Sequence, residues 1–126
     1  MKKILIVSSD RHLLGMLKHE LSFRGYTIDT IDDPYSTTLL IQLFAPDLLI
    51  IDFILNDHNG GAISHQVKSD PETQHLPVIL LSDYVLETHY PSRFGCDMVI
   101  EKTDEIQPLI LGIQHLFQEK EMAFHE

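Results

Sequence analysis

Three polar side chains, each placed at the end of an apolar run, define the chemistry that this sequence offers. Asp52 ends the run PDLLIID, Ser82 lies at the end of LPVILLS, and Lys102 ends MVIEK. If they converge, a carboxylate, a hydroxyl and an ammonium group suit chemistry on a phosphoryl group. The carboxylate would act as the nucleophile, while the other two groups would hold phosphoryl oxygens.

The segments around these residues predict the elements that must position them. Apolar runs alternate with amphipathic stretches along the whole chain, which indicates an α/β protein with a parallel sheet covered by helices on both faces. The carboxyl ends of parallel strands meet at one edge, so we expect Asp52, Ser82 and Lys102 to lie together there. The expected strands cover 4–7, 26–31, 46–52, 76–83 and 98–102, and the expected helices cover 11–24, 34–44, 62–68 and 106–120. Residues 83–95 show no regular pattern, and Pro91 limits any helix there.

Length and composition narrow the class of protein. The chain has 126 residues and a net charge of −10, with 44% hydrophobic residues. We expect one domain over residues 1–120 and a polar tail over 121–126 that frays or leads into a further domain. The acidic balance argues against direct binding of nucleic acid. No apolar run approaches the roughly 18 residues of a membrane span. Cys96 is the single cysteine and fits a reducing cytoplasm.

The order of these motifs resembles the receiver domain of two-component response regulators, from Lys3 to about Phe117. The resemblance rests on KKILIV, FRGYTID, PDLLIID with Asp52 at the phosphoacceptor position, the following Asn59-Gly60, DPETQHLPVILLS, and FGCDMVIEK. It implies a flavodoxin-like (βα)5 fold, a doubly wound parallel five-stranded sheet in the order 2-1-3-4-5. It also implies signalling in a phosphorelay rather than enzymatic turnover, with a histidine kinase or another signalling protein as partner. A homodimer is an open alternative.

The sequence departs from this family where the metal ion would bind. The family ends its first strand with two adjacent acids that hold Mg²⁺, and here those positions are Ser8 and Ser9. The remaining ligands would be Asp52, Ser9, Asp10 and the backbone carbonyl of Ile54. Hydroxyls are weak, neutral ligands for a cation that prefers carboxylates, so we expect weak Mg²⁺ binding. We also expect Asp10 to cap the first helix, and Asp52 and Lys102 to form an ion pair whose charges sum to zero.

Two further departures affect the switch itself. Asp83 follows Ser82 where the family has a small residue, and Val99 stands where the family has an aromatic residue that rotates. The sequence therefore predicts a receiver domain in which Mg²⁺-dependent phosphorylation of Asp52 is impaired. The alternative is a receiver that takes no phosphate and acts only as a protein-binding module.

Overall fold

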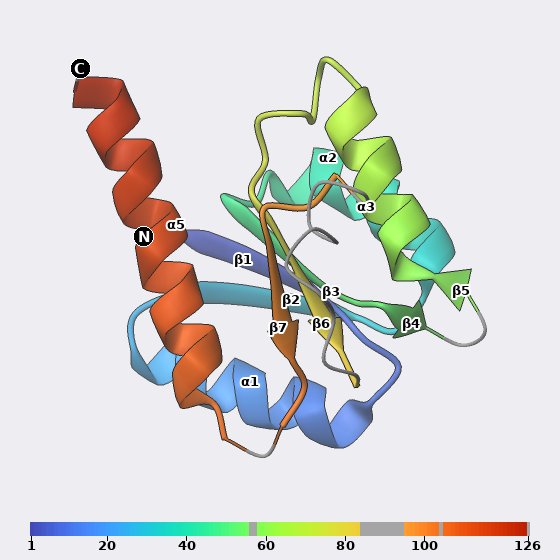
Figure 1. Ribbon diagram of the computed structural model, residues 1–126. Helices are drawn as coiled ribbons and strands as arrows, with labels where there is room; N and C mark the ends of the chain where they lie inside the picture. The colour runs from blue at the N-terminus through green and yellow to red at the C-terminus, as the bar shows by residue number, and fades with distance from the viewer. Residues whose placement is uncertain (56–57, 84–94, 104, 126) are drawn as a thin grey trace.

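A five-stranded parallel sheet with helices on both faces forms the body of the protein (Figure 1). The computed structural model describes residues 1–55, 58–83, 95–103 and 105–125. Its elements are β1 (Lys3–Val7), α1 (Arg11–Phe23), β2 (Thr27–Ile31), a 3₁₀ turn (Pro34–Ser36), α2 (Thr37–Phe44), β3 (Leu48–Asp52), β4 (Ile54–Leu55), β5 (His58–Asn59), α3 (Gly60–Ser69), β6 (Val78–Ser82), β7 (Met98–Glu101) and α5 (Gln107–His125).

The strand order of the sheet is β2-β1-β3-β6-β7. Counting only these five strands, this is the predicted order 2-1-3-4-5. All four pairings are parallel, so the carboxyl ends of the strands lie at one edge. The central strand β3 is buried along its whole length, as its uninterrupted apolar sequence indicates.

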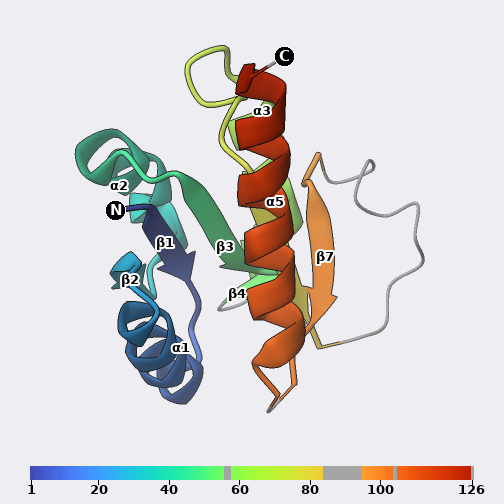
Figure 2. The same ribbon diagram turned by 90° about the vertical axis from the view of Figure 1, so that its left-hand side faces the viewer.

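Side chains alternate between two cores, one on each face of the sheet. Ile4, Ile6 and Ile50 pack against α1 and α5, which cover one face. Leu5 and Ile51 point to the other face, where Ile41 of α2 and Val67 of α3 complete the core. Figure 2, turned by 90°, shows α2 at the margin of the molecule, beside the N-terminus.

The predicted ends of two helices are wrong. Helix α3 begins at Gly60 rather than at residue 62, because the Asn59 side chain caps it by accepting from the N–H groups of Gly61 and Ala62 at 2.8 and 3.3 Å. Before this helix, β5 pairs antiparallel with β4. Helix α5 continues to His125 instead of ending near residue 120, which agrees with the helix-forming residues of its last turns.

Two further expectations concern the irregular segment around Pro91 and membrane-spanning helices. The irregular segment around Pro91 falls within residues 84–94, outside the described residues. No helix in the described part of the chain is long and apolar enough to cross a membrane.

Candidate functional site

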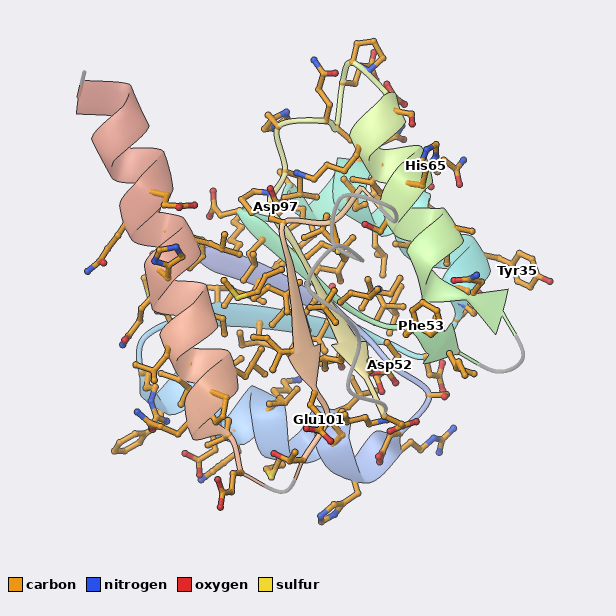
Figure 3. All side chains as sticks on the ribbon, viewed as in Figure 1. Tyr35, Asp52, Phe53, His65, Asp97 and Glu101 are labelled. Atoms are coloured by element: carbon orange, nitrogen blue, oxygen red, sulfur yellow. The ribbon has the colours of Figure 1, made fainter. Side chains whose placement is uncertain are left out.

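Four strand ends bring the predicted site residues to the same edge of the sheet. The strand register places Val7 beside Ile51, so Ser8 follows β1 at the level where Asp52 ends β3. The backbone N–H of Lys102 donates to the carbonyl of Ser82 at 2.7 Å. Asp52 therefore lies between Ser8 on one side and the ends of β6 and β7 on the other, at the lower end of the sheet in Figure 3.

The Asp52 carboxylate has two neighbours that bind the same oxygen. The Ser8 hydroxyl donates to Oδ2 of Asp52 at 2.5 Å, and Lys102 Nζ donates to Oδ2 at 3.3 Å. The expected ion pair is present, but the hydroxyl bond is the shorter contact. Oδ1 is buried and has no hydrogen-bond partner in the described structure. With Asp52 only 2% exposed, one oxygen is held and the other is covered.

Burial decides the direction of the pKa shift at Asp52. Removing the carboxylate from water disfavours its charged form and raises the pKa above the usual 3.8 for this group. The hydrogen bond from Ser8 and the charge of Lys102 act in the opposite direction without cancelling the effect of burial. Ser8 and Lys102 thus compensate only in part for the missing solvent.

Asp10 has a larger role than the sequence indicated. As expected, it caps α1: Oδ1 accepts from the N–H of Leu13 at 3.0 Å, and this bond is the main cause of its lowered pKa. Its other oxygen, Oδ2, lies 3.6 Å from Lys102 Nζ. The charge balance of Asp52 and Lys102 alone was therefore wrong, because a second carboxylate shares the ammonium group. Counting only Asp10, Asp52 and Lys102, with both acids ionised, the net charge is −1.

Ser8 is the residue whose role the sequence did not reveal. It is fully buried, and its Oγ also accepts from the backbone N–H of Asp10 at 3.1 Å. The sequence suggested only that it was a poor metal ligand. A usable signal was present, because Ser8 and Asp52 each follow a four-residue apolar run on neighbouring strands. Ser9, next along the chain, is half-buried.

The two remaining positions of the site lie on either side of Lys102. Ser82 is buried at the end of β6, whereas Asp83 is exposed. Asp83 lines an open depression of about 610 Å³ together with Asp10, His12 and Lys102. Among the described residues, the ion pairs of Lys102 are with Asp52 and Asp10, and not with Asp83.

These residues do not fit Mg²⁺ in the way that the family's acidic pair would. Oδ1 of Asp10 is engaged by the helix end and its Oδ2 by Lys102, and the free oxygen of Asp52 is covered. Ser9 offers a neutral hydroxyl, and Ile54 belongs to β4, where it pairs with Asn59. Within the described ranges no three His, Cys, Asp or Glu side chains gather as a metal-binding group. A dication that prefers several carboxylate oxygens finds few here.

The turn after Asp52 is fixed by its backbone. The N–H of Gly60 donates to the carbonyl of Phe53 at 2.7 Å. A Cβ on Gly60 would stand 1.8 Å from the carbonyl oxygen of Asp52, so only glycine fits at this position. Figure 3 shows Asp52 and Phe53 side by side where the chain leaves the sheet.

Comparisons with known proteins find response regulators. Over 80 residues the chain is 32% identical to the phosphate regulon transcriptional regulatory protein PhoB of Rhizobium meliloti. The matched region covers 64% of this chain and 35% of PhoB. It is 25% identical over 124 residues to the response regulator MprA of Mycobacterium ulcerans, and this match covers 98% of this chain and 53% of MprA. The fold is similar to that of the response regulator TrrA of Thermotoga maritima, solved with Mg²⁺ and BeF, with a TM-score of 0.76 and 26% identity. This match covers 92% of this chain and 99% of the TrrA chain.

The chain is thus similar to response regulators in its sequence and to a solved response regulator in its fold. No family model matches it. The chain spans about half or less of the length of the curated relatives named here. TrrA was solved in complex with Mg²⁺ and BeF, and this chain carries Ser8 and Ser9 directly after β1.

Proposed function

We propose that this receiver domain keeps Asp52 in the phosphoacceptor position but that its Mg²⁺-dependent phosphorylation is impaired. The observation that carries the proposal is the Ser8–Asp52 hydrogen bond of 2.5 Å, in place of an acid that would hold the metal ion. For transfer, a carboxylate oxygen of Asp52 must attack phosphorus while the bond from phosphorus to its donor breaks. Oδ2 already accepts two hydrogen bonds, and Oδ1 is covered.

Charge supports the same proposal. Phosphoryl transfer brings further negative charge to a site that already holds two carboxylates and one ammonium group. A divalent cation normally offsets such charge, and its loss removes a main stabiliser of the transition state. Lys102 offsets only one unit, and it is shared between Asp10 and Asp52. We therefore expect slow phosphorylation even with a good phosphodonor.

The proposed partners are a histidine kinase or another signalling protein, and the proposed location is the cytoplasm. The second candidate function is a receiver domain that takes no phosphate and acts as a protein-binding module. The standing Lys102–Asp52 ion pair favours it, because Lys102 already binds the acceptor carboxylate without a bound metal. Direct binding to nucleic acid is not proposed, since the chain carries 19 acids against 9 bases.

Intact-mass analysis after incubation with a small-molecule phosphodonor tests the proposal. The unmodified domain should gain little or no phosphoryl group, with or without Mg²⁺. Ser9→Asp, alone and with Ser8→Asp, should raise Mg²⁺ affinity and allow one phosphoryl group to be added. Adding Asp52→Asn to these variants should abolish the gain.

Two results would contradict the proposal. If the unmodified domain is labelled as fast as an ordinary receiver domain, the serines do not impair the reaction. If the Asp variants bind Mg²⁺ no better than the unmodified domain, the missing acids are not the cause of the defect. No labelling of the unmodified domain, together with rescue by the Asp variants, would support it.

A further inference from the structure

We propose that the exposed face of α2 is a homodimer interface, in which two copies pack their α2 helices antiparallel across a two-fold axis at Leu39. Three large apolar side chains of this segment are exposed: Tyr35 by 79%, Leu39 by 55% and Leu43 by 72%. Leu39 and Leu43 belong to α2, and Tyr35 belongs to the 3₁₀ turn that leads directly into it. The three residues stand four positions apart in the sequence and are called the ridge below. Figure 3 shows Tyr35 projecting away from the body of the molecule.

The opposite side of α2 already has its place in the fold. Thr37 and Ile41 are buried, and Ile41 packs into the core beneath the sheet. The ridge of Tyr35, Leu39 and Leu43 is thus not the core side of this amphipathic helix. Contiguous exposed apolar side chains of this size mark interaction sites more often than single ones do.

Charge favours a second copy as the occupant. The domain carries a net charge of −10, so two copies repel each other over most of their surfaces. Residues 34–46 contain no charged side chain. Along α2, two copies can therefore approach without placing acid against acid.

The ridge has the symmetry that such a contact needs. A two-fold interface uses the same patch on both copies. With the axis at Leu39, Tyr35 of one copy faces Leu43 of the other, and the two Leu39 side chains meet. Leu39 and Leu43 of α2 are four apart, and α-helical ridges with this spacing interdigitate in the commonest class of helix packing.

The charged groups at the two ends of α2 also complement each other in this arrangement. Asp32 lies before the helix with its side chain half-exposed, 3.6 Å from Arg11. Lys3 lies at the other end, where Nζ donates to the carbonyl of Phe44 at 3.2 Å, and Asp47 accepts from the backbone N–H of Lys3 at 2.8 Å. Each end thus carries one acid and one base, and antiparallel packing brings Asp32 of one copy towards Lys3 of the second, and Arg11 towards Asp47.

A depression beside the ridge gives the second copy a place to insert side chains. It measures about 470 Å³ and lies between α1, β2 and the first half of α2. Leu14, Ile31 and Leu40 are among its lining residues. Leu43 of the second copy would lie over it. Three side chains per copy form a patch smaller than the roughly 1,200–2,000 Å² of a standard interface, so the dimer should be weak.

Sedimentation of the whole chain tests this interface, with a matched pair of variants. Leu39→Lys places a charge at the proposed axis. Leu111→Lys makes the same change on α5, at a leucine that is 56% exposed, as against 55% for Leu39. The unmodified chain should dimerise with a dissociation constant between about 10 µM and about 1 mM. Leu39→Lys should raise this dissociation constant by about tenfold or more. Leu111→Lys should leave it unchanged. Thermal melts should show that both variants fold, because both sites are exposed.

Cross-linking supplies a second measurement. Leu39→Cys should form a disulfide-linked dimer under mild oxidation, because the axis brings the two positions together, whereas Leu111→Cys should not. Cys96 is buried and burial raises its pKa to about 11, so it should not compete. A chain that stays monomeric at about 1 mM would overturn the proposal. A dimer sensitive to Leu111→Lys but not to Leu39→Lys, or one in which Leu39→Cys fails to cross-link, would also overturn it.

Discussion

The junctions β1–α1 and β3–α3 leave the sheet at the same edge, yet they are held in different ways. After β3, backbone groups fix the chain: Gly60 approaches the carbonyl of Asp52 too closely for any side chain, and Asn59 caps α3. After β1, side chains hold the chain: Ser8 bonds to Asp52, and Asp10 caps α1 and reaches Lys102. The comparison teaches that backbone contacts fix one side of this site, whereas side-chain charges and hydrogen bonds fix the other.

Gly60→Ala should have the largest effect, because it breaks the backbone frame. The new Cβ would stand 1.8 Å from the backbone oxygen of Asp52 and 2.8 Å from its carbonyl carbon, neither of which can rotate away. We expect the free energy of unfolding to fall by about 3 kcal/mol or more. Urea unfolding followed by circular dichroism measures the change.

Gly15→Ala is the matched control for that variant. Gly15 lies within α1, and a Cβ there would meet nothing within 4 Å. Replacing an exposed glycine inside a helix with alanine should raise the free energy of unfolding by about 0.5–1 kcal/mol. Equal losses at both glycines would show that close backbone contact is not the reason for Gly60.

Lys102→Met should have the next largest effect on stability, because it removes the ammonium group that contacts both Asp52 and Asp10. Asp52 would keep the Ser8 hydroxyl but lose its buried charge partner. We expect a loss of about 2 kcal/mol at pH 7, below the usual cost of breaking a buried pair because Asp52 can take up a proton instead. Urea unfolding at pH 7 and at about pH 5 should show a smaller loss at the lower pH.

Lys18→Met is its control, since Lys18 is an exposed lysine of α1. This variant should change the free energy of unfolding by less than about 0.5 kcal/mol. If Lys102→Met is equally mild, the charge of Lys102 does not stabilise Asp52.

Asp52→Asn should have a smaller effect, with a sign that depends on pH. Burial raises the pKa of Asp52, so the folded protein binds this proton more tightly than the unfolded chain does. The stabilising contribution is present below the ordinary value of 3.8 and is lost as the pH rises through the folded-state pKa. Asn avoids that loss and keeps an acceptor oxygen for Ser8. The variant should have the higher Tm at pH 7.

The advantage of Asp52→Asn should shrink as the pH falls towards 3.8, the ordinary value for Asp52. Thermal melts at several pH values between these limits measure the trend. A constant difference in Tm over the whole range would contradict the assignment of burial as the main cause of the raised pKa.

Asp10→Ala should have the smallest effect of the series. It removes the side-chain cap of α1 and the 3.6 Å contact with Lys102. We expect a loss of about 1 kcal/mol, mostly from the cap. Asp10→Asn keeps a good cap and removes only the charge, so its loss in urea unfolding should be much smaller. Equal losses would assign the effect to the ion pair instead.

The sequence predicted the fold well because its signals are local and repeated. The run from Leu48 to Asp52 is apolar without a break, as a strand buried on both faces requires. Leu13, Leu17 and Leu21 stand four apart and are all buried in α1. The predictions were wrong at element ends, where single contacts decide. The Asn59 cap moved the start of α3, and that cap depends on the backbone path after Asp52.

By itself, the sequence determined that Asp52, Ser82 and Lys102 lie at one edge, because parallel strands end on the same side of their sheet. Only the tertiary structure decided which groups bind one another there. Ser8 and Asp52 are 44 positions apart, and Asp52 and Lys102 are 50 apart. Such contacts depend on strand register and on distances of a few tenths of an ångström, for which no local pattern exists. The sharing of Lys102 by Asp10, and the ridge that α2 leaves exposed, follow from the same packing.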